Sequence, residues 1–75
     1  MSTQNFQLTA EYIELDNLLK FLSIASSGGA AKVMIVEGMV TVDGTLETRK
    51  TRKLRAGCVV RVGDEEVHIL AQEIA

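Results

Sequence analysis

Proline is absent from this chain of 75 residues, so its turns must rest on glycine, aspartate and serine. Cys58 is the single cysteine, which excludes an internal disulfide and a Cys-x-x-Cys metal site and is typical of a reducing compartment. One tyrosine and two phenylalanines are too few for the stacking surface that binds extended single strands of nucleic acid. These absences exclude a disulfide scaffold, a zinc knuckle and an aromatic single-strand platform.

Long hydrophobic segments and catalytic motifs are also missing. The longest apolar run, residues 33–36, is four residues long, whereas a membrane span needs about 20. The N-terminus has neither the basic nor the apolar region of a secretory signal. His68 is the only histidine, so a zinc site or a nucleophile–base pair lacks partners. We expect a cytoplasmic protein with no membrane segment, no metal, no cofactor and no enzymatic activity.

The charge is unevenly distributed, although the formal net charge is only −2. Residues 49–55 carry five cations and no acid, and the segments on either side are both acidic. Such asymmetry can direct a chain to a polyanion even when the total charge is negative, and the alternative is a solvated loop. We call residues 49–55 the basic segment; its cations are Arg49, Lys50, Arg52, Lys53 and Arg55.

Two helices are predicted in the first half of the chain. Four leucines with helical spacing predict a helix over about 15–24, with Lys20 pointing away from the apolar face. Ser26 or Ser27 is a suitable N-cap for a second helix, which Gly38 would end. The buried side chains expected of these helices are Leu15, Leu18, Leu19, Leu22, Ala31, Met34 and Ile35.

Alternating apolar residues predict antiparallel strands in the second half. Asp43 and Gly44 form a strong hairpin signal between Val40–Val42 and Leu46. Two further strands are predicted, one by Val60 with Val62 and the other by Val67 with Ile69. A short strand near the N-terminus is predicted from Phe6, Leu8 and Ile13. Two helices followed by strands predict one α+β domain over residues 1–75.

Residues 27–62 carry a run of spaced motifs: SGGAAKVMI at 27–35, EG at 37–38, VTVDG at 40–44 and GCVVRV at 57–62. These stretches together resemble the S-four RNA-binding domain, a family named for a small-subunit ribosomal protein. The leucine helix extends the match back to residue 15, so the motif core spans 15–62. The resemblance implies an αL RNA-binding motif, in which two helices pack on a small antiparallel or mixed sheet.

The stand-alone members of that family are the most similar. Their second helix contains Gly-Ala-x-Ala-Lys, and Glu-x-Arg-[Arg/Lys]-x-x-Lys follows their hairpin; GGAAK at 28–32 and ETRKTRK at 47–53 match these. The resemblance implies contacts to RNA from helix and loop cations, and helix N-termini hold phosphates through backbone amides. The implied RNA-binding residues are Lys32, Arg49, Lys50, Arg52, Lys53 and Arg55. The helix start at Ser27, Gly28 and Gly29 suits a phosphate contact, and simple capping is the alternative.

Three positions depart from the family pattern. Glu14 and Gly28 stand where arginines are common, and Lys50 stands where proline is common. We therefore expect the contact to have moved toward the basic segment. The predicted function is non-catalytic binding to the phosphates of structured RNA, ribosomal or transfer RNA, with the ribosome or RNA-processing machinery as wider partners. The alternative is a protein-interaction adaptor that has lost RNA binding.

Overall fold

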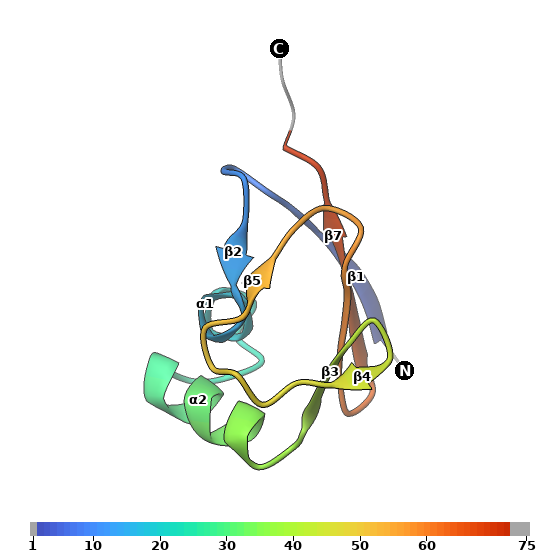
Figure 1. The fold of residues 1–75 in the computed structure, drawn as a ribbon. Coiled ribbons are helices and arrows are strands. Elements are labelled where there is room, and N and C mark those ends of the chain that lie inside the picture. Colours follow the sequence, from blue (N-terminus) through green and yellow to red (C-terminus); the bar gives the residue numbers. More distant parts are fainter. Residues whose placement is uncertain (1, 73–75) are drawn as a thin grey trace.

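The computed structural model describes residues 2–72, so residues 1 and 73–75 of the expected domain lie outside it. The described chain forms two helices and seven strands (Figure 1). In chain order these are β1 (Ser2–Gln7), β2 (Ile13–Glu14), α1 (Leu15–Phe21), α2 (Gly28–Val36), β3 (Val40–Val42), β4 (Thr45–Leu46), β5 (Lys53–Leu54), β6 (Val59–Val62) and β7 (Glu65–Leu70).

Five strands form a mixed sheet in the order β1-β7-β6-β3-β4. β1 runs parallel to β7, and the other neighbours are antiparallel. β2 and β5 form a separate two-stranded ribbon, and β2 leads directly into α1 (Figure 1). This arrangement confirms the expected α+β class with two helices and a small mixed sheet.

The core lies where α1 and α2 meet the inner face of the sheet and the ribbon (Figure 1). Leu15, Leu18 and Leu19 of α1 are completely buried, as the helical spacing predicts. In α2, Ala31 and Ile35 are completely buried and Met34 is partly buried. The sheet and ribbon add Val40, Val42, Leu54, Val60, Val62, Val67 and Ile69.

The first helix is shorter than predicted, since α1 ends at Phe21 rather than near residue 24. Ser23 has a φ of 61°, in the left-handed region, and this breaks the helical path. The amides of Ile24 and Ala25 both bond to the carbonyl oxygen of Leu19, at 3.0 Å each. The chain therefore turns back onto its own last turn, and Leu22 still packs on the core.

The N-terminal region also differs from the prediction of one short strand. β1 carries Phe6 and pairs with β7, whereas Ile13 belongs to β2 and pairs with Leu54 of β5. Leu8 lies between them and is buried. A parallel partner for β1 lies about sixty residues away in sequence, so local alternation cannot reveal the pairing.

The predicted turns are confirmed where positive φ angles are required. Asp43 and Gly44 have φ values of 52° and 82°, as a two-residue hairpin turn needs. Gly38 has a φ of 81° and follows the end of α2. Within residues 2–72, neither helix has the length and apolar character required to cross a membrane.

Candidate nucleic-acid interface

The basic segment follows β4, includes β5 and lies against the N-terminal end of α1. The carbonyl oxygens of Arg52 and Lys50 accept hydrogen bonds from the amides of Leu15 and Asp16, at 2.9 and 3.2 Å. These amides begin a helix and have no carbonyl partner within it. The backbone of the segment is therefore anchored to the core, and its side chains project from a fixed position.

Glu47 holds two of the five cations of the basic segment. The residue is only 6% exposed, and its carboxylate accepts bonds from Nε and Nη2 of Arg49, both at 3.0 Å, and from Nη1 of Arg52 at 2.7 Å. The amide of Arg49 donates a further bond at 2.9 Å. We call Glu47, Arg49 and Arg52 the clamp. Glu47 was not among the binding residues predicted from the sequence, although the family pattern contains it together with Arg49.

The clamp shifts the pKa of both main partners. The hydrogen bond from the Arg49 side chain is the largest cause that lowers the pKa of Glu47 to about 2, against an opposing effect of burial. The same bond raises the pKa of Arg49. A carboxylate that accepts several charge-assisted bonds stays ionised at all ordinary pH values. The charge of Glu47 therefore offsets part of the positive charge of the basic segment.

Lys53 and Arg55 lie beside Tyr12, which immediately precedes β2. The Nζ atom of Lys53 lies 5.1 Å, and Cζ of Arg55 5.6 Å, from the centre of the Tyr12 ring, within cation–π range. Leu54, between the two cations, is completely buried, so alternation directs its neighbours outward. Glu14 pairs with Lys53 in the ribbon register and adds a carboxylate next to this group.

Lys32 and Lys50 line one hollow, although they are far apart in sequence. The hollow has a volume of about 320 Å³ and its other lining residues are Val33, Val36 and Glu37. Val33 and Val36 are 56% and 52% exposed on the outer face of α2. Both valines lie outside the buried stripe expected for this helix, and no binding role was predicted for them from the sequence.

Four cations are therefore left available on the loop, the ribbon and α2. Within residues 2–72, no carboxylate forms an ion pair with any of them; the ion pairs there belong to Arg49, Arg52, Arg61 and His68. A cation without a carboxylate partner can exchange its counterions for a phosphate. We call these residues the open cations: Lys32, Lys50, Lys53 and Arg55.

The start of α2 has the predicted cap. Ser27 Oγ accepts a hydrogen bond from the amide of Ala30 at 3.1 Å. Gly28 is the first helical residue, and a Cβ atom added there would have no neighbour within 4 Å. A side chain can therefore begin at this position without a clash at Cβ, so contacts there do not explain the absence of the arginine that the family pattern often has.

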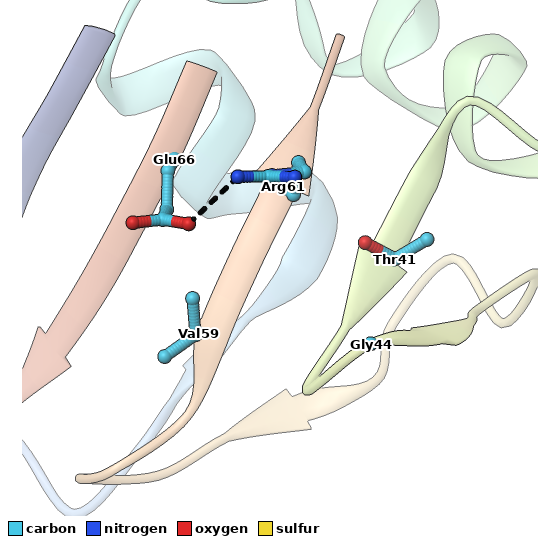
Figure 2. A pocket seen from close by; sticks show the side chains of 5 residues that line it. All are labelled: Thr41, Gly44, Val59, Arg61 and Glu66. Carbon is cyan, nitrogen blue, oxygen red and sulfur yellow. Dashed lines mark hydrogen bonds and ion pairs between the residues drawn. The ribbon is translucent and has the colours of Figure 1, made fainter. Parts of the chain in front are cut away.

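A separate polar network lies on the outer face of the five-stranded sheet. Nη2 of Arg61 and Nε2 of His68 contact opposite oxygens of Glu66, at 3.0 and 2.9 Å. Figure 2 shows Arg61 on β6 reaching Glu66 on β7, with Thr41 on the neighbouring strand. The contact with His68 is the main cause that lowers the pKa of Glu66. His68 is thus a strand residue with a carboxylate partner, and Cys58 is partly buried against the core.

Comparisons with known proteins decide the family. The S4 domain model, which is the S-four domain above, matches residues 6–70. The chain belongs to the S4-domain family. It is 43% identical over 60 residues to "Putative RNA-binding protein YbcJ" of Escherichia coli (strain K12), covering 80% of this chain and 86% of that protein. "Uncharacterized protein YbcJ" of Shigella flexneri matches with the same identity and coverage.

A solved structure supports the same assignment. The solution structure of YbcJ from E. coli, described as revealing an ALFAL motif involved in RNA-binding, matches with a TM-score of 0.69 at 41% sequence identity. The match covers 89% of this chain and 86% of the other. The S4-domain family is non-catalytic, in agreement with the expectation that the chain is not an enzyme.

Proposed function

We propose that this S4-domain protein binds structured RNA through backbone phosphates, with Lys32, Lys50, Lys53 and Arg55 as the main contacts. The observation that carries the proposal is the separation of these open cations from the clamp. Phosphate contacts supply most of the sequence-independent affinity for nucleic acid. Arg49 and Arg52 contribute mainly by shaping the segment from which Lys50 and Lys53 project.

The fold favours folded RNA over extended strands. Tyr12 is the aromatic residue beside the open cations, and it already contacts Lys53 and Arg55. A single ring cannot form a track of stacked bases, whereas fixed cations suit the regular phosphates of a helix. Ribosomal or transfer RNA in the cytoplasm is the proposed target, and the ribosome or RNA-processing machinery the proposed setting. The amides at Ser27, Gly28 and Gly29 are a further proposed phosphate contact.

Salt-dependent binding tests this proposal directly. Fluorescence anisotropy with a transfer RNA and with a ribosomal RNA stem–loop should show affinity that falls by about three log units for a tenfold rise in salt, since four phosphate contacts each contribute roughly 0.7–0.9. Replacing all four open cations with alanine should abolish binding, and Lys20→Ala is the matched control on α1. Salt-insensitive binding, or binding unchanged in the fourfold variant, would contradict the proposal.

The protein-interaction alternative has its own signature. Glu14 and Gly28 remove two cations that the family pattern often has, which favours a loss of RNA binding. If so, crosslinking in cells would recover protein and no defined RNA. Under the proposal, the same experiment followed by sequencing recovers one RNA class, and replacing the open cations removes it.

A further inference from the structure

We propose that the hollow between α2 and the basic segment binds one unpaired nucleotide of the RNA, with the base on Val33 and Val36. This inference rests on the proposed function and specifies what the RNA must contain. The hollow combines three kinds of chemistry within about 320 Å³: two exposed valines, two lysines and one carboxylate. A nucleotide has the matching parts, namely an apolar base face, a phosphate and a base edge with N–H donors.

The valines indicate more than electrostatic contact. Residues 32, 33, 36 and 37 share one side of α2 by helical spacing, and Ala31 and Ile35 face the core. An exposed valine is less favourable in a helix than alanine, and its contact with water does not stabilise the fold. An RNA surface made of phosphates alone would not contact these apolar side chains. Apolar side chains do contact the faces of bases that have left the helical stack.

The lysines and the carboxylate orient that nucleotide. Lys32 and Lys50 come from α2 and from the basic segment and line the same hollow. Neither has an ion-pair partner within residues 2–72. Glu37 lines the hollow too and would repel a second phosphate, whereas a carboxylate accepts hydrogen bonds from amino groups on base edges. A continuous duplex would present phosphates to all three residues, and an unpaired nucleotide presents one phosphate and one base.

Three synthetic RNA hairpins that differ at one position test this inference. The first has a single bulged guanosine in its stem, the second has an abasic nucleotide in the same bulge, and the third is fully paired. Anisotropy titrations should show that the wild-type protein binds the bulged guanosine about tenfold more tightly than the abasic bulge, the size expected when one base face buries apolar surface against two valines. The abasic bulge retains the phosphate and the flexibility, so the difference reports the base alone.

Variants then assign the preference to the hollow. Val33→Ser combined with Val36→Ser should remove the tenfold preference and leave affinity for the paired hairpin unchanged. Both valines are more than half exposed, so the fold should be retained, which circular dichroism checks. Leu70→Ser is the matched control, because Leu70 is an exposed apolar residue on β7. Lys32→Ala with Lys50→Ala should weaken binding to all three hairpins.

Each other outcome has a distinct meaning. Equal affinity of the wild-type protein for all three hairpins would overturn the inference and leave the proposed function intact. A preference that persists in the double valine variant would overturn it as well, because the base would then lie elsewhere. Failure to bind any hairpin in a salt-dependent manner would instead count against the proposed function, and the exposed valines would then be candidates for a protein contact.

Discussion

The clamp and the open cations are neighbours in sequence but serve different purposes. Arg49 and Arg52 share one buried carboxylate, whereas Lys50 and Lys53 alternate with them and have no such partner within residues 2–72. Of the five cations in the basic segment, two are therefore held by Glu47 and three are available to bind a phosphate. Counting basic residues overestimates an interface wherever a buried acid neutralises some of them.

The largest expected effect comes from reversing the charge of two open cations. Lys50→Glu with Lys53→Glu should weaken binding to a folded RNA by about a hundredfold, because two phosphate contacts become repulsions. The thermal midpoint should fall by only a few degrees, because Lys53→Glu faces Glu14 across the two-stranded ribbon. Anisotropy and thermal unfolding measure the two quantities, and Lys20→Glu is the control. A large drop in the thermal midpoint would show that these lysines mainly stabilise the fold, as the clamp does.

Breaking the clamp should have the opposite effect, lowering stability more than RNA affinity. Glu47→Gln removes the charge that two arginines share, and we expect the free energy of unfolding to fall by about 1–3 kcal/mol. We expect a value near the lower end of this range, because the side chain of Arg49 is 72% exposed and water can hydrate it once the charge of Glu47 is removed. Urea denaturation measures it, with Glu11→Gln as an exposed control. Unchanged stability would mean that the clamp contributes no net free energy.

The pH dependence of stability should report the same carboxylate. The pKa of Glu47 is lowered from 4.5 to about 2 in the folded chain, so its ionised form stabilises the fold. This contribution is fully present above the unfolded value and is lost as the pH falls through the folded value. The difference in thermal midpoint between wild type and Glu47→Gln should therefore shrink between pH 4.5 and about 2. A difference that stays constant over that range would contradict the assignment.

Restoring the arginine that the family pattern often has at position 28 should add a further open cation. Gly28→Arg places a cation one helical turn before Lys32, at a position with no neighbour within 4 Å. We expect RNA affinity to rise about fivefold, with a small loss of stability because a cation near a helix N-terminus is unfavourable. Gly28→Gln is the control of similar size, and anisotropy measures both. Equal affinities of the two variants would show that RNA does not reach this end of α2.

The smallest expected effect concerns the ring beside two open cations. Tyr12→Leu removes the cation–π contacts that hold Lys53 and Arg55, so affinity should fall by about twofold to threefold. Tyr12→Phe keeps the ring and should bind like wild type. If leucine and phenylalanine behave alike in the anisotropy titration, the ring does not order these cations.

Local patterns in the sequence determined much of the fold. The leucine spacing placed α1, Ser27 and Gly38 bounded α2, and Asp43 with Gly44 defined the β3–β4 hairpin. Each of these signals acts over a few residues, through helical periodicity, capping or a positive φ angle. The basic segment was equally visible, since charge can be read directly along the chain.

The tertiary structure alone decided which cations are available. Glu47 can hold both arginines of the clamp because it is buried, with its amide bonded to the carbonyl oxygen of Val40 on β3, and burial depends on the whole fold. Lys32 and Lys50 line one hollow only because the basic segment caps α1 and passes close to α2. The sequence determined the presence of the charges, and packing determined which are neutralised, because Coulomb interactions and burial depend on distances in space.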